Sequence, residues 1–162
     1  MGISARRGVP PGDLVSFGVA GGLDGLEIGA VVDATRIVDE RGNVLWEGPG
    51  LGVRGARRGT ILASDRIVED PDERRRLREA TGADAIDMES GVLAATGRLR
   101  GCVRAVSDTP DRPLGALAGA VTPDGRPRVL GFLGALVREP AGTVRALGGI
   151  RRALAALREV QA

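Results

Sequence analysis

Short apolar runs alternate with helix-forming segments through the middle of the chain. The segments, in order, are "TILAS" (60–64), "EDPDERRRLREATG" (69–82), "ADAID" (83–87), "MESGVLAATG" (88–97) and "GCVRAVSD" (101–108). The first, third and fifth are typical of buried strands, and the second and fourth are typical of helices. This alternation predicts an α/β fold, with a right-handed parallel crossover formed by the last three segments.

The helix predicted before Gly82 has clear signals at both ends. Asp70 is suited to the N-cap, Pro71 to the first helical position, and Gly82 to the position just past the end. Its several arginines are predicted to form a solvated face.

Further strands are predicted before this region, and helices after it. Asp13 to Val19 forms a strand that ends in the glycine loop "AGGLDG", and Ala30 to Asp39 forms a longer strand. "RGNVLWEG" suggests a turn with a short strand, and residues 48–59 a surface loop. From Val129 onward two amphipathic helices are expected. With no internal repeat, residues 1–162 are predicted to form a single domain.

Composition excludes several kinds of chemistry. The 162 residues contain no His, one Cys and 2% aromatic residues, and all 23 basic residues are Arg. Histidine-based nucleophilic catalysis and the commonest zinc ligands are therefore absent, and we expect no metal site. Scattered arginines without stacking aromatics argue against nucleic acid as a partner. The sequence has no signal-peptide-like or membrane-spanning apolar run, so a cytoplasmic protein is expected.

Three carboxylates fall at predicted strand ends. Ligands of open α/β sheets collect beyond the carboxyl ends of the strands, where Asp87, Glu89 and Asp108 would lie. Spacing alone leaves another interpretation open, in which Asp87 or Glu89 only caps the helix that follows. Cys102 is interpreted as a buried apolar residue.

The amino-acid sequences of these segments resemble motifs of a known family. "DMESGVLAAT" followed by "VRAVSD", the earlier "SFGVAGGLDGLEIGAVV" and the intervening "ILASDRIVED" are similar, in the same order, to motifs of the nucleoside phosphorylase and nucleosidase family. The region from "DRPLGALAG" to "IRRALAAL" is similar to the hopanoid-associated phosphorylases. The resemblance covers roughly Leu14 to Leu157 and implies a three-layer α/β/α sandwich with a mixed central sheet that is short at its N-terminus.

By this resemblance, Asp108 would protonate or hydrogen-bond the purine N7, and Glu89 would bind the ribose hydroxyls. Met88 would pack beneath the sugar. Ala20 and Gly21 match the turn on which the nucleoside lies, where small residues allow close approach.

Ile67 and Val68 match the segment whose backbone reads the adenine edge. The family often has an aromatic residue near Ile67, so this chain departs from the pattern for base stacking. A further departure is Ala30, where the family commonly has an aspartate.

The implied activity is cleavage of the N-glycosidic bond of a purine (adenosyl) nucleoside, with adenosylhopane as the substrate suggested by the hopanoid branch. Water and phosphate remain alternative nucleophiles; no cofactor is implied, and phosphate would be a co-substrate only in phosphorolysis. The implied partners are a small-molecule nucleoside, a membrane touched peripherally through a lipid substrate, and further copies of the chain in a homo-oligomer.

The short N-terminus leaves alternatives open. Several strands precede the glycine motif in the family, whereas only "MGISARRGVPPG" precedes Asp13. We therefore expect an exposed sheet edge. The alternatives are a truncated, non-catalytic remnant that binds nucleosides or forms oligomers, and an anion-binding regulatory domain built on the "GVAGG" loop.

Overall fold

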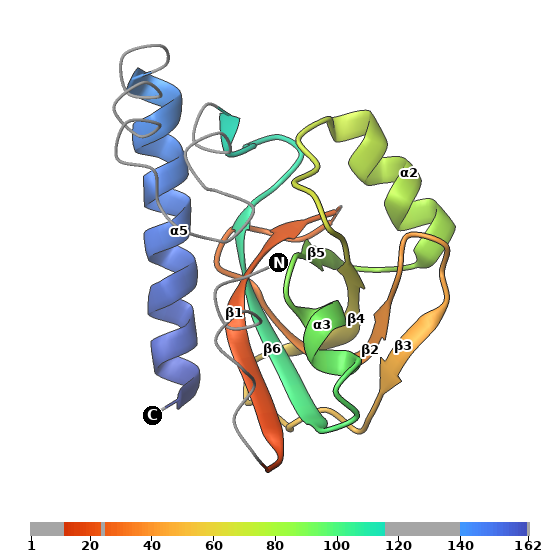
Figure 1. Cartoon of the computed structure of the whole chain (residues 1–162). Helices are drawn as coiled ribbons and strands as arrows, with labels where there is room; N and C mark the ends of the chain where they lie inside the picture. Colours follow the sequence, from red (N-terminus) through yellow and green to blue (C-terminus); the bar gives the residue numbers. More distant parts are fainter. Residues whose placement is uncertain (1–11, 24, 116–139, 162) are drawn as a thin grey trace.

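A computed structural model describes residues 12–23, 25–115 and 140–161. The described part contains one mixed sheet with helices packed on it (Figure 1). The elements are β1 (Leu14–Gly22), β2 (Val31–Val38), β3 (Val44–Glu47), β4 (Arg57–Ala63), α2 (Pro71–Thr81), β5 (Ala85–Asp87), α3 (Ser90–Ala94), β6 (Leu99–Asp108) and α5 (Pro140–Gln161). The predicted strands are all present, and of the two C-terminal helices α5 is present while residues 129–139 lie outside the described part.

The sheet is mixed and curls back on itself. Its strand order is β3-β2-β4-β5-β1-β6, and β6 also pairs with β2. The pairs β1/β6, β2/β4 and β4/β5 are parallel, whereas β1/β5, β2/β3 and β2/β6 are antiparallel. The predicted mixed sheet is confirmed, and its closure through β2 and β6 was not anticipated.

The predicted parallel crossover from β5 through α3 to β6 is wrong. Gly21 of β1 is opposite Ile86 in an antiparallel pair and opposite Asp108 in a parallel pair, so β5 and β6 run in opposite directions. The reason is the pairing of both strands with β1: Ile86 lies opposite Gly21, near the end of β1, and Leu99 lies opposite Leu14, at its start. The segment through α3 therefore continues in the direction of β5, and β6 runs back along β1.

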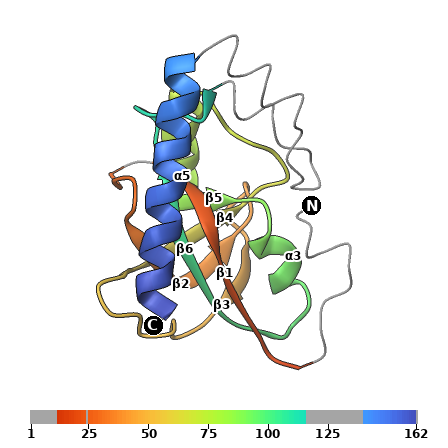
Figure 2. The same cartoon turned by 90° about the vertical axis from the view of Figure 1, so that its left-hand side faces the viewer.

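Helices cover both faces of the sheet (Figures 1 and 2). Long α5 lies along β6 and β1, where Ala153 and Leu157 pack on Val103 and Ala105. On the other face, α3 contributes Ala94 to a separate apolar cluster with strand residues. The arrangement is the expected three-layer α/β/α sandwich.

The boundaries of α2 agree with the prediction. The Asp70 carboxylate accepts a hydrogen bond from the Glu73 backbone N–H, Pro71 occupies the first turn, and Gly82 takes the left-handed conformation at φ 69°. A carboxylate at the N-cap satisfies a backbone donor that has no partner within the helix.

Residues 48–56 form the predicted surface loop, although β4 begins earlier than expected, at Arg57. Buried Asp33 fixes the loop, because its carboxylate accepts hydrogen bonds from the backbone N–H groups of residues 51–53.

One side of β1 has few partners among the described strands. β6 pairs along its whole length, but on the other side only Gly21 and Gly22 pair, with β5. Val15, Phe17 and Val19 are 49%, 38% and 37% exposed. Among the described strands, the expected open edge therefore lies along β1, and these three side chains are partly exposed on one face of that strand. Separately, no helix in the described ranges has the length and apolar character needed to cross a membrane.

Two adjacent glycines of α5 predict opposite stability effects. A Cβ on Gly149 would lie 2.3 Å from the carbonyl oxygen of Ser107, whereas a Cβ on Gly148 would meet nothing within 4 Å. We expect Gly149→Ala to lower the free energy of unfolding by about 1–3 kcal/mol through overpacking. Gly148→Ala should raise it by roughly 0.5–1 kcal/mol through helix propensity. Urea unfolding of both variants tests this, and equal effects would show that α5 does not pack closely on Ser107.

Candidate active site

A cavity of about 460 Å³ lies where β1 and β6 end and α3 begins. All seven residues proposed from the sequence line it: Ala20, Gly21, Ile67, Val68, Met88, Glu89 and Asp108. The remaining lining residues are Gly18, Val19, Arg66, Arg74, Ile86, Asp87, Ser107, Leu114, Ile150 and Leu154. The three sequence motifs thus converge on one cavity, which has the volume of a small-molecule site.

A second cavity, of about 650 Å³, lies beside α3, β3 and the loop after β2 and shares Arg66 and Met88 with the first. Its polar side chains are largely paired with one another. Glu40 accepts hydrogen bonds from the Ser64 hydroxyl at 2.7 Å and from Arg66 at 3.4 Å, and Arg66 also donates to Glu73 at 2.8 Å. Because Met88 is its only residue among the seven, we assign the smaller cavity as the candidate site.

Asp108 ends β6 and is only 3% exposed. Its Oδ1 accepts a hydrogen bond from the Ser107 hydroxyl at 2.7 Å, and its Oδ2 accepts one from Arg74 Nη2 at 2.5 Å. The carboxylate is therefore held in one orientation. Each carboxylate oxygen has two acceptor positions, so both oxygens can still contact a ligand in the cavity.

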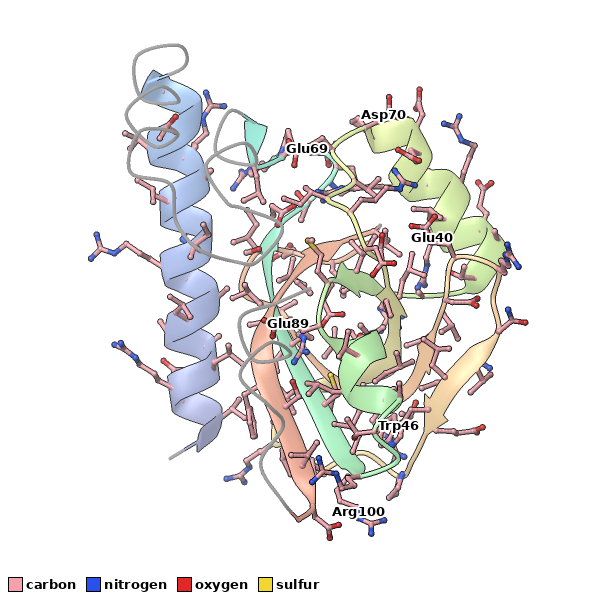
Figure 3. The ribbon with its side chains drawn as sticks, viewed as in Figure 1. Glu40, Trp46, Glu69, Asp70, Glu89 and Arg100 are labelled. Atoms are coloured by element: carbon pink, nitrogen blue, oxygen red, sulfur yellow. The ribbon has the colours of Figure 1, made fainter. Side chains whose placement is uncertain are left out.

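Glu89 lies at the start of α3, on the side near β1 (Figure 3). It occupies the N-cap position, but its side chain makes no capping hydrogen bond. Asp87 caps α3 instead, because its Oδ1 accepts hydrogen bonds from the backbone N–H and the hydroxyl of Ser90. Asp87 thus caps the helix, although it does not act only as a cap, and the capping interpretation is wrong for Glu89. No described side chain forms an ion pair with Glu89.

Asp87, two positions before Glu89, forms a buried ion pair with Arg104. Arg104 is 1% exposed, donates from Nε to Asp87 Oδ2 at 2.5 Å, and donates from Nη2 to the Ser16 hydroxyl at 3.0 Å. Burial opposes the charged form of Arg104, but the neighbouring Asp87 carboxylate outweighs it and raises the pKa of the guanidinium. This pair fixes the chain just before Met88 and Glu89.

Gly21 has no room for a side chain, because the Asp108–Arg74 ion pair occupies the space next to its Cα. A Cβ there would lie 3.1 Å from Asp108 Oδ2 and 3.3 Å from Arg74 Nη1. Its φ is not positive, so the requirement is close approach and not a left-handed conformation. The resemblance implied close approach of a nucleoside at this glycine; the structure adds close approach of Asp108 and Arg74.

Ile67 and Val68 differ in what they offer the cavity. Ile67 is 36% exposed, whereas the Val68 side chain packs in an apolar cluster with Leu62 and Ile86. The Val68 carbonyl oxygen accepts a hydrogen bond from Arg74 Nε at 2.7 Å. One of the backbone groups expected to read the purine edge is therefore already paired with an arginine.

Arg74 is a cavity-lining residue that the sequence interpretation missed. The arginines of α2 were expected on a solvated face, and Arg75 is indeed exposed, but Arg74 is 1% exposed. The sequence contains a signal for this burial. Arg74 precedes Leu77 and Thr81 by three and seven positions, which places all of them on one helical face.

Among the described residues, Cys102 is not a thiolate nucleophile, and no metal centre is found. Cys102 is fully buried, and burial raises the pKa of its thiol to about 12, so the thiol is neutral at pH 7. Within the described ranges, no group of three or more His, Cys, Asp or Glu side chains could hold a metal ion.

Comparison with known proteins identifies the family. The model of the phosphorylase superfamily matches residues 51–138, which is just over half of the chain. The chain therefore belongs to the phosphorylase superfamily, and the resemblance of its sequence to the nucleoside phosphorylase and nucleosidase family is confirmed. The match spans the base-pocket segment, Arg74, Glu89 and Asp108. A search of curated proteins gave no match.

Solved nucleosidase structures have a similar fold. A 5′-methylthioadenosine/S-adenosylhomocysteine nucleosidase from Colwellia psychrerythraea 34H in complex with adenine aligns with a TM-score of 0.52 and 16% identity, over 85% of this chain and 67% of that one. The apo 5′-methylthioadenosine nucleosidase of Arabidopsis thaliana aligns with a TM-score of 0.51 and 16% identity, over 98% and 66%.

A futalosine hydrolase mutant of Helicobacter pylori strain 26695 gives a TM-score of 0.50 and 18% identity, over 65% of this chain and 62% of that one. The alignments thus span only about two thirds of the length of these enzymes. At such identities the likeness shows the fold.

Proposed function

We propose that the chain cleaves the N-glycosidic bond of a purine nucleoside, with an adenosyl compound as substrate. The observation that carries this proposal is that Asp108 and Glu89, from separate elements, line one cavity. Asp108 is held by Ser107 and Arg74, while the Glu89 carboxylate is unpaired among the described residues.

The proposed chemistry assigns one carboxylate to each half of the substrate. Cleavage passes through an oxocarbenium-like state in which the purine leaves with negative charge and the ribose becomes positive. In its protonated form, Asp108 would donate a hydrogen bond or its proton to N7 of the departing purine, and the carboxylate left behind would be paired with Arg74. Glu89 would bind the ribose hydroxyls, and its negative charge favours the positive sugar more in the transition state than in the ground state.

The nucleophile is part of the proposal and is either water or phosphate. No cofactor is needed for either route. The most direct test is to incubate the chain with adenosine and 5′-methylthioadenosine, with and without inorganic phosphate, and to measure free adenine and the sugar product. With adenosine, free ribose indicates hydrolysis and ribose 1-phosphate indicates phosphorolysis; with 5′-methylthioadenosine, the corresponding products are the 5-methylthio sugars. Adenine binding without any release of base from these nucleosides would instead support the nucleoside-binding remnant.

The apolar wall of the cavity suggests the nature of the 5′ substituent. Ile150 and Leu154 of α5 face the cavity together with Leu114 and Ile67. We propose that this wall accepts an apolar 5′ group, with adenosylhopane as the extreme case. The cytoplasmic location, peripheral membrane contact through a lipid substrate and homo-oligomeric state belong to the same proposal, the last supported by the exposed edge of β1.

Replacing Leu154 with Asp tests the apolar wall. We expect kcat/KM for 5′-methylthioadenosine to fall by about tenfold relative to adenosine, because a carboxylate disfavours an apolar group beside it. Val144→Asp is the matched control, since Val144 is exposed on the same helix and does not line the cavity. An unchanged preference between the two substrates in Leu154→Asp would place the 5′ group elsewhere.

A further inference from the structure

Arg74 connects three segments of the candidate site through one buried guanidinium. Its Nε donates to the Val68 carbonyl oxygen at 2.7 Å, its Nη1 to the Gly22 carbonyl oxygen at 3.1 Å, and its Nη2 to Asp108 Oδ2 at 2.5 Å. These acceptors belong to the base-pocket segment, the glycine motif and the end of β6. The contacts are made from α2, which the sequence motifs do not include.

The geometry of these contacts requires a planar group with several donors. A guanidinium carries five N–H donors in a fixed fork, and here each of its three nitrogens reaches a different segment. A lysine ammonium in the same place would keep the charge beside Asp108 but could not keep all three directions. The arrangement therefore fixes orientation as well as neutralising charge.

Other groups close to the guanidinium support the same role. Glu69 Oε1 lies 4.0 Å from Arg74 Nη2, and Glu69 Oε2 accepts a hydrogen bond from the Gly115 backbone N–H at 2.8 Å. Figure 3 shows Glu69 in the segment leading into α2. Burial raises the pKa of the Glu69 carboxyl. Gly21 leaves the space that the Arg74 and Asp108 side chains fill.

We propose that Arg74 is a positioning residue for glycosidic-bond cleavage, which fixes the Asp108 carboxylate relative to the two backbone segments that enclose the purine. This inference rests on the proposed function, because it assigns Asp108 to the leaving base. Arg74 acts through Asp108 and takes no proton itself. A loosely held Asp108 carboxyl group would present its proton to N7 in the productive direction less often, which lowers the rate of the chemical step more than it weakens binding.

The test is Arg74→Lys in the full chain, with adenine release as the readout. The variant keeps a cation beside buried Asp108, so it avoids leaving that carboxylate unpaired. We expect kcat to fall by about tenfold or more, with KM changed by less than about threefold. Arg76→Lys is the matched control on the exposed face of α2, and it should retain the activity of the unmodified chain.

A second measurement separates positioning from support of the fold. Arg74→Lys is also made in an Asp108→Asn chain, and adenine release is compared among the four proteins. If Arg74 acts through Asp108, its replacement should have little further effect in the Asp108→Asn background, since residues that act as a unit are not additive. An equal loss in both backgrounds overturns the inference.

A kcat of Arg74→Lys within about twofold of the unmodified chain also overturns it, as does a loss that appears in KM alone. Failure of the proposed function itself would give a different experimental result. In that case the unmodified chain releases no base from any adenosyl nucleoside, and the result counts against the activity itself before Arg74 is replaced.

Discussion

Asp108→Asn is expected to reduce purine release by at least about a hundredfold while leaving adenine binding largely intact. An amide retains the shape of the carboxylate and can hydrogen-bond a purine, but it cannot deliver a carboxylic proton. The position is rigid, because both oxygens of Asp108 are held in the structure, by Ser107 and Arg74. The measurement is single-turnover release of adenine beside calorimetric titration with adenine.

The control must separate lost chemistry from lost stability. Asp108→Asn leaves buried Arg74 without its charged partner, which is expected to be destabilising. Asp84→Asn is a suitable match, since Asp84 is also buried, pairs with Arg57 and Arg78, and does not line the cavity. If Asp108→Asn turns over at nearly the normal rate, Asp108 does not assist the leaving base.

The sequence predicted those parts of the structure that depend on residues close together in the chain. The cap at Asp70 and the stop at Gly82 delimit α2 as expected, because both act through hydrogen bonds within a few residues. The motifs also predicted the lining residues of the cavity. These residues are close in the chain to strand ends, and the strand ends meet at one place.

Long-range features were not predictable in the same way. The direction of β5 relative to β6 depends on which strands pair, and periodicity does not record pairing. The closure of the sheet by β2 and β6 is likewise a tertiary contact. Arg74 was missed because an arginine among arginines on a helix is usually solvated, and its spacing to Leu77 and Thr81 indicates a shared face but not the buried partner Asp108.

Asp87 and Glu89 are both carboxylates close together in the sequence, but their environments in the structure differ. Asp87 accepts hydrogen bonds from Arg104 and Ser90, whereas Glu89, two positions later, forms no hydrogen bond or ion pair with a described side chain and feels only the more distant charge of Arg104. A carboxylate that neither caps a helix nor pairs with a cation gains little for the fold. Its position on the cavity wall therefore favours a role in ligand binding.

Glu89→Gln is accordingly expected to lower kcat/KM for the ribosyl substrate by at least about a hundredfold and to remove discrimination against the 2′-deoxyribosyl analogue. A carboxylate accepts hydrogen bonds from both ribose hydroxyls and attracts the sugar as it becomes positive, whereas an amide supplies one acceptor oxygen and no charge. The comparison is kcat/KM for adenosine against 2′-deoxyadenosine in both proteins.

The two interpretations of Glu89 also differ in their stability effects. Because Asp87 makes the capping hydrogen bonds, Asp87→Asn should lower the free energy of unfolding, whereas Glu89→Gln should leave it nearly unchanged. A Glu89→Gln protein that prefers adenosine by the original margin and unfolds more easily would show that Glu89 supports α3 after all. The ribose hydroxyls would then have to be bound by other residues of the cavity.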